Sequence, residues 1–96
     1  MSEQERIETV LANVERPSFV KEIRFTLDND WAGDPGVFIW VILQDDIAAS
    51  REILKYTTPI RSAIAQALRA AEIDRWPYVH IRGESEQAEL DRTEAA

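Results

Sequence analysis

The chain contains no cysteine, which excludes disulfide bonds, thiolate metal sites and cysteine nucleophiles. Its one histidine, His80, is too few for the histidine clusters of zinc sites. Three glycines occur, and none belongs to a GxGxxG or GxxxxGK phosphate loop. The longest apolar run, Val37–Leu43, is far shorter than the ~18 residues of a membrane helix. We therefore expect neither an enzyme nor a cofactor, and no membrane partner.

Charge is also unevenly spread along the 96 residues, whose net charge is −7. Residues 83–96 hold five acidic residues and one arginine, and this composition predicts a flexible acidic tail after one domain at residues 1–82. Without clustered Lys and Arg, non-specific binding to a phosphate backbone is disfavoured. The charged, amphipathic N-terminal segment lacks the apolar centre of a signal peptide, so we expect a cytoplasmic protein.

Hydrophobic spacing predicts an α+β fold in the order α-β-β-α-α-β, with helices packed on one face of a three-stranded sheet. Ser2 and Glu5 suit a capping box for the first helix, and Thr58–Pro59 suits the start of another. Pro35–Gly36 suits the centre of a type II turn between the first two strands. The predicted helices cover residues 3–14, 47–56 and 59–73, and the predicted strands cover 20–27, 37–43 and 78–82.

The strand at residues 37–43 is apolar on both faces, which a half-exposed strand would not be. One face carries Phe38, Trp40 and Ile42, and Trp31 lies in the loop before it. Two arrangements remain open: the first helix crosses to cover this face, or the face stays partly bare. In the second arrangement Trp31, Phe38, Trp40 and Ile42 form a partner-binding strip.

Two other candidate sites have weak support in the sequence. The segment Asp28–Gly33 (DNDWAG) begins like a calcium loop, but Ala32 stands at the fifth position and Ile39 at the twelfth, where a glutamate is required. Turn formation explains its Asp and Asn residues without a metal. His80 has no nucleophile or carboxylate placed beside it by any motif, so a surface role on its strand is the simpler interpretation.

Part of the sequence resembles the ribosome-binding factor A family, across residues 3–86. The resemblance is carried by the order of elements, by the Val37–Leu43 strand, by Ile60-Arg61-Ser62 at a helix start, and by Glu84-Ser85-Glu86 after the last strand. It implies a KH-like (type II) fold. It also implies RNA or ribosome contact near a helix break at Tyr56–Arg61.

Two functional hypotheses follow. The first is a small acidic interaction or regulatory protein that acts through protein–protein contacts, either as a homodimer or as a subunit of a complex. The alternative is a KH-like RNA- or ribosome-associated factor that binds nucleic acid through Arg61 and Arg69. The acidic charge favours the first hypothesis.

Overall fold

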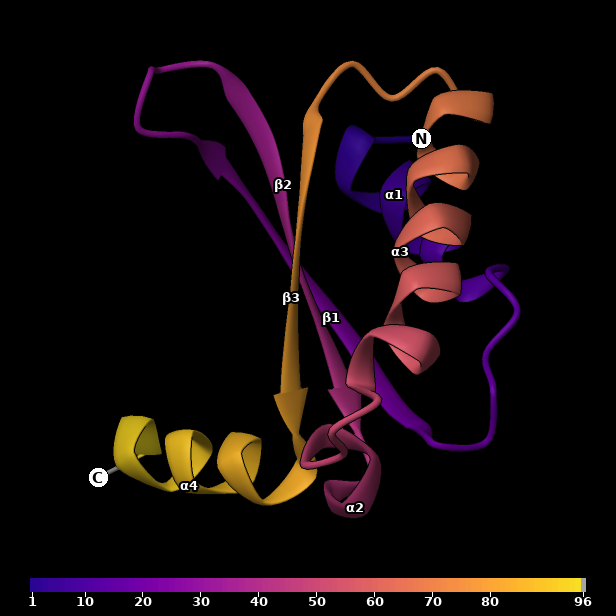
Figure 1. The fold of residues 1–96 in the computed structure, drawn as a ribbon. Coiled ribbons are helices and arrows are strands. Elements are labelled where there is room, and N and C mark those ends of the chain that lie inside the picture. The colour runs from indigo at the N-terminus through magenta and orange to yellow at the C-terminus, as the bar shows by residue number, and fades with distance from the viewer. Residues whose placement is uncertain (96) are drawn as a thin grey trace.

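The order of elements confirms the predicted α+β class and adds a fourth helix at the C-terminal end. The computed structural model describes residues 1–95, and Figure 1 shows its ribbon. Its elements are α1 (Glu3–Ala12), β1 (Val20–Asn29), β2 (Pro35–Leu43), α2 (Asp45–Ala48), α3 (Ile53–Ala70), β3 (Trp76–Gly83) and α4 (Glu84–Ala95). The Ser2–Glu5 capping box at the start of α1 is confirmed. No helix within residues 1–95 is both long enough and apolar enough to cross a membrane.

The three strands form one mixed sheet in the order β1-β2-β3. β1 and β2 are an antiparallel hairpin, and β3 pairs parallel to β2 after the crossover through α2 and α3. The register aligns Arg24, Trp40 and His80 across the sheet, and two positions further along each strand it aligns Thr26, Phe38 and Tyr78. Because facing residues in neighbouring strands point to the same side, each row lies on one face of the sheet.

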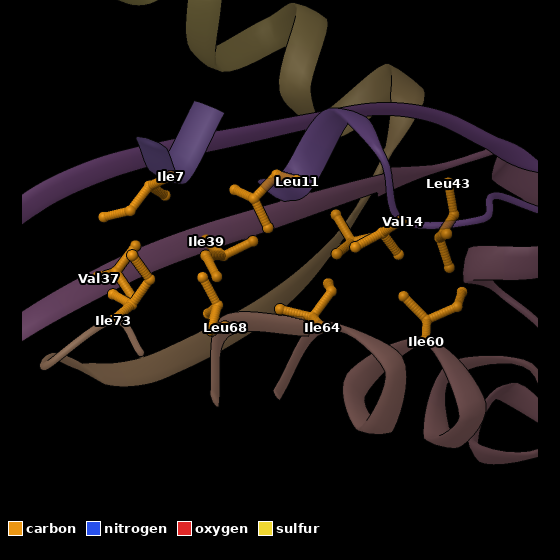
Figure 2. Close-up of a cluster of buried hydrophobic side chains, with 11 residues drawn as sticks. Ile7, Leu11, Val14, Val37, Ile39, Leu43, Ile60, Ile64, Leu68 and Ile73 are labelled. Atoms are coloured by element: carbon orange, nitrogen blue, oxygen red, sulfur yellow. The ribbon is translucent and has the colours of Figure 1, made fainter. Parts of the chain in front are cut away.

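The hydrophobic core lies between the sheet and the α1–α3 layer, as Figure 2 shows. The alternate residues of the central strand, Val37, Ile39, Val41 and Leu43, are completely buried there. Each buried aliphatic side chain contributes about 1.5–3 kcal/mol relative to an exposed one. The helices contribute a matching stripe at helical spacing: Ile7 and Leu11 from α1, with Ile60, Ile64 and Leu68 from α3.

The position of the break between the second and third helices was predicted incorrectly. Thr58 and Pro59 do not start a helix but lie inside α3, and the break falls instead at residues 49–52. Pro59 removes the hydrogen bond to the carbonyl of Lys55. Since Lys55 is exposed, water can satisfy that carbonyl, while Thr57 and Ile60 on either side of the proline are buried. Burial of this helix face outweighs the local proline signal.

The hairpin turn also differs from its prediction. Pro35 and Gly36 belong to β2, where Pro35 pairs with Asn29. The turn is formed instead by the preceding residues 30–34. Gly33, with φ of 84°, supplies the left-handed residue that the turn needs. Asp30 Oδ1 accepts hydrogen bonds from the backbone N–H groups of Ala32 and Asp34, both at 2.9 Å. This Asx-type turn explains the Asp and Asn density of the loop.

The segment predicted as a flexible tail forms α4, which packs on the face of the sheet opposite α1 and α3 (Figure 1). The prediction of helices on one face alone is therefore wrong. Glu84 and Glu86 lie in the first turn, where carboxylates favour the positive end of the helix dipole. Asp45 accepts hydrogen bonds from the backbone N–H of Ser85, at 2.9 Å, and from the Ser85 hydroxyl. These contacts fix the start of the helix to α2.

Candidate interaction surface

Aromatic side chains gather on the sheet face that α4 shares, and they are called here the aromatic face: Trp31, Phe38, Trp40, Tyr78 and His80. Phe38 and Tyr78 stack with ring centroids 5.0 Å apart and planes inclined by 18°. Trp40 and His80 stack at 5.7 Å and 23°. Trp31 extends the first pair from the hairpin loop, 5.3 Å from Tyr78. Offset and tilted ring pairs of this kind stabilise one another in addition to the area they bury.

The aromatic face is only partly covered by the chain itself. Ile42 is 2% exposed beneath α4, so its assignment to a partner-binding strip is wrong. Phe38 and Trp40 are half-buried, and Trp31 is 85% exposed. The structure thus divides the predicted strip into a covered end at Ile42 and an open end at Trp31, Phe38 and Trp40. Since α1 lies in the opposite layer, the first helix does not cross to this face (Figure 1).

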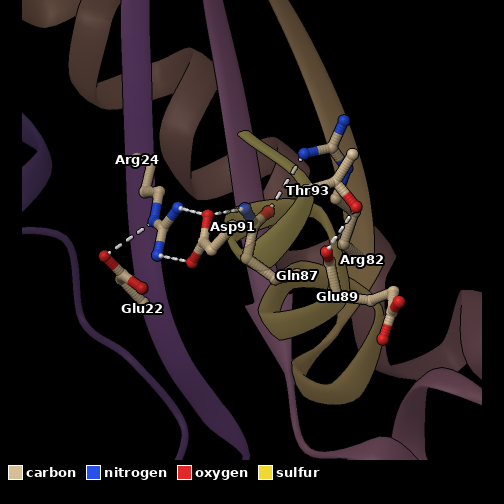
Figure 3. A network of polar contacts seen from close by, with 7 residues as sticks. All are labelled: Glu22, Arg24, Arg82, Gln87, Glu89, Asp91 and Thr93. Atoms are coloured by element: carbon tan, nitrogen blue, oxygen red, sulfur yellow. Dashed lines mark hydrogen bonds and ion pairs between the residues drawn. The ribbon is translucent and has the colours of Figure 1, made fainter. Parts of the chain in front are cut away.

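A polar network attaches α4 to the covered end of the face (Figure 3). Arg24 on β1 donates to both carboxylate oxygens of Asp91, at 2.9 and 3.0 Å, and also to Glu22 at 2.9 Å. Gln87, which is buried, donates to Asp91 and accepts a hydrogen bond from Arg82 at 3.0 Å. The hydrogen bonds that Asp91 accepts from Arg24 and Gln87 hold its pKa at about 2, and the hydrogen bonds that Arg24 donates to Asp91 and Glu22 raise the pKa of Arg24.

Arg82 connects this network to the open aromatic side chains. Its guanidinium carbon lies 5.5 Å from the centre of the Trp40 ring, within the range of a cation–π contact. A shallow hollow of about 310 Å³ between the sheet and α4 is bordered by Arg24, Trp40, Arg82 and Glu94. Arg24 is therefore ion-paired with Asp91 and Glu22, whereas Arg82 is held by the neutral amide of Gln87 and by the Trp40 ring.

At the opposite end of the face, the Tyr78 hydroxyl anchors the hairpin loop by donating to Asp30 Oδ2 at 2.7 Å. This hydrogen bond is the main cause that raises the pKa of Tyr78 to about 12 and lowers that of Asp30. The oxygens of Asp30 are thus occupied by Tyr78 and by loop N–H groups. Within residues 1–95, no three His, Asp or Glu side chains come close enough together to hold a metal ion.

The two arginines of the nucleic-acid hypothesis lie on α3, in the helical layer on the other side of the sheet. Arg61 donates to the carbonyl of Val79 at the β3 edge, at 2.6 Å, and Arg69 is exposed. Residues 56–61 are continuous helix, so the structure does not have the helix break that the resemblance implied at Tyr56–Arg61. The structure does not bring Arg61 or Arg69 to the aromatic face.

Sequence reasoning gave His80 a surface role on its strand but did not place His80 or Tyr78 beside Phe38 and Trp40 on the aromatic face. The alternation in the last strand does place Tyr78, His80 and Arg82 on one side. The alternation does not indicate which strand of the sheet lies beside the last strand. The parallel pairing with β2 sets Tyr78 beside Phe38 and His80 beside Trp40.

No protein-family model, curated protein or solved structure matches the chain.

Proposed function

We propose that the chain is a small, non-catalytic interaction protein whose aromatic face binds a protein partner with a basic contact surface. The observation that carries the proposal is the row Trp31–Tyr78–Phe38, which runs from a largely exposed indole to the central strand of the sheet. Rigid aromatic side chains supply much of the binding energy at protein interfaces when a partner excludes water from them. Contiguous apolar patches left in solvent typically mark such interfaces.

Charge indicates the kind of partner. Arg24 and Arg82 are already engaged by Asp91 and Gln87, while Asp28 and Asp34 are exposed at the loop end of the face. A surface of this sign is complementary to Lys and Arg on the partner. Two copies of a chain of net charge −7 would repel each other as they approach, which favours a basic partner over a homodimer.

The alternative is that the same stacked rings bind nucleic acid bases. Open sheets with exposed aromatic side chains do serve as platforms for single-stranded RNA. Such platforms combine the rings with a basic groove for the backbone. This face lacks unengaged arginines within the described residues, and Arg61 and Arg69 lie on the other layer. RNA association is therefore the weaker hypothesis.

Site-specific crosslinking tests the proposal. A benzophenone amino acid at Thr26, which is exposed and faces Phe38, samples the aromatic face. The same group at Leu54 on α3, which is 70% exposed, samples the helical layer as a matched control. We expect one basic protein to be crosslinked from position 26 and not from position 54. Adding Trp31→Ala should weaken that crosslink, since truncation of a central interface tryptophan costs about 2 kcal/mol or more in binding.

Other products of the same experiment would contradict the proposal. A crosslinked second copy of the chain, together with a dimer in light scattering, would show that the face covers itself. Crosslinking to RNA from position 26 would support the alternative. A crosslinked protein whose yield is unchanged by Trp31→Ala, or equal from positions 26 and 54, would remove the aromatic face as the binding surface.

A further inference from the structure

A hollow of about 470 Å³ lies at the loop end of the aromatic face, between the hairpin and the start of β3. Its lining includes two aromatic side chains and four charged ones: Trp76, Tyr78, Asp30, Asp34, Asp74 and Arg75. Trp76 is 65% exposed, although it begins a strand whose other residues are mostly half-buried. An indole held in water beside a hollow is costly unless something covers it.

The charge inside the hollow is negative after its internal contacts are taken into account. Arg75 is engaged by Glu3 at 3.0 Å and by the carbonyls of Asp28 and Gly36 at 3.4 and 2.8 Å. Its positive charge is thus matched by Glu3 outside the lining. Within residues 1–95, the carboxylates of Asp34 and Asp74 have neither a hydrogen-bond donor nor an ion-pair partner. A cation that enters meets these two carboxylates together with Asp30.

The shape and chemistry of the hollow suit an organic cation better than a metal ion. The carboxylates are too far apart to meet as a group of three around a metal. A guanidinium is planar, so it can stack on an indole while its N–H groups reach carboxylates on either side. An ammonium is more strongly hydrated and lacks the flat face. The exposed Trp76 ring therefore favours arginine over lysine.

We infer that this hollow receives an arginine side chain of the protein partner, which stacks on Trp76 and pairs with Asp34 and Asp74. The inference rests on the proposed function, because it names the group that the basic partner inserts. The hollow adjoins the aromatic face through Tyr78, which contacts Trp31 and Phe38 and also lines the hollow. One partner can thus cover the aromatic face and reach the hollow together.

The experiment uses the whole chain and two small probes, N-acetyl-arginine amide and its uncharged isostere N-acetyl-citrulline amide. The three indole N–H signals are assigned by single Trp→Phe variants and followed by NMR during titration. We expect arginine amide to shift the Trp76 signal saturably, and citrulline amide to shift it little. Asp34→Asn with Asp74→Asn should weaken binding about tenfold, the loss expected for two partly exposed charge contacts. Asp46→Asn with Glu52→Gln, on and beside α2, removes the same charge elsewhere and should leave binding unchanged.

Equal shifts from the two probes, equal affinities of the two double variants, or a response confined to Trp31 or Trp40 would overturn the inference. Correct folding of each variant is verified by its dispersed amide spectrum. The probes require no partner, so this result is independent of the crosslinking experiment. If arginine amide does not bind but crosslinking still depends on Trp31, the arginine hollow alone is removed. If arginine amide binds at Trp76 but crosslinking does not depend on Trp31, the aromatic face is removed as the partner surface.

Discussion

The guanidinium of Arg24 on β1 meets the carboxylate of Asp91 on α4 through two parallel hydrogen bonds, although 67 positions separate them in sequence. Such two-pronged pairs fix orientation as well as distance. α4 has few apolar side chains, so its place on the sheet depends on this pair, on Gln87 and on the Asp45 contacts at its start. α4 in turn buries Ile42 and sets where the aromatic face ends.

Replacing Asp91 by Asn should loosen α4 without disturbing the core. The variant keeps the size of the side chain but loses the charge that Arg24 pairs with. We expect the amide protons of α4 to exchange several times faster, with rates in β2 unchanged. Glu89→Gln is the matched control, because Glu89 pairs with Arg92 within α4 and not with the sheet. Equal exchange in both variants, or faster exchange in β2 of the Asp91 variant, would contradict this role.

Acid should loosen α4 in a window set by the same pair. Folding lowers the pKa of Asp91 from its ordinary 3.8 to about 2, chiefly through the hydrogen bonds from Arg24. A carboxyl with a lowered folded pKa stabilises the native state fully above its ordinary pKa. That contribution disappears as the pH falls from 3.8 towards 2. We expect α4 signals in NMR spectra to change in this window, and the change to be absent in Asp91→Asn. A transition of equal size in the variant would assign it to other carboxyls.

Tyr78 should titrate abnormally at the alkaline end. Its hydrogen bond to Asp30 raises its pKa from 10.0 to about 12. The raised value means that the neutral phenol stabilises the folded loop below pH 10, and that this contribution is lost as the pH rises through 12. We expect ultraviolet titration to show a tyrosine that ionises near pH 12, and Asp30→Asn to return the pKa of Tyr78 towards 10. Asp28→Asn, near the end of β1 and without this contact, should leave the titration unchanged.

The sequence predicted the middle strand correctly because its signal is local. The continuous apolar run over Val37–Leu43 indicated two covered faces, and the helix-facing set is fully buried. The same reasoning could not predict what covers the other face. α4 is attached by Arg24, which lies 67 positions before its partner Asp91, and a segment of this acidity carries no hydrophobic stripe. Composition alone therefore predicted a flexible tail.

The candidate site was predicted in part for a similar reason. Trp31, Phe38 and Trp40 were identified because they lie on or next to one strand. Tyr78, His80 and Trp76 come from a strand that reaches β2 after a crossover, and strand order is not encoded in local spacing. The Thr58–Pro59 and Pro35–Gly36 signals failed because helix burial and hairpin pairing outweighed them.

The turn that presents Trp31 offers a last prediction, because its left-handed residue has space for a side chain. A Cβ added at Gly33 would meet no atom within 4 Å, so the effect of a substitution comes from φ of 84° alone. Gly33→Ala should lower the free energy of unfolding by about 1–2 kcal/mol, and Gly33→Asn by less, because asparagine tolerates this conformation better. Urea denaturation with unchanged slopes measures both. At Gly36, a Cβ would lie 3.2 Å from ring carbons of Phe38 and Tyr78, so Gly36→Ala should also disturb the NMR signals of the aromatic face. Equal stabilities of the two Gly33 variants would show that the turn does not depend on this backbone angle.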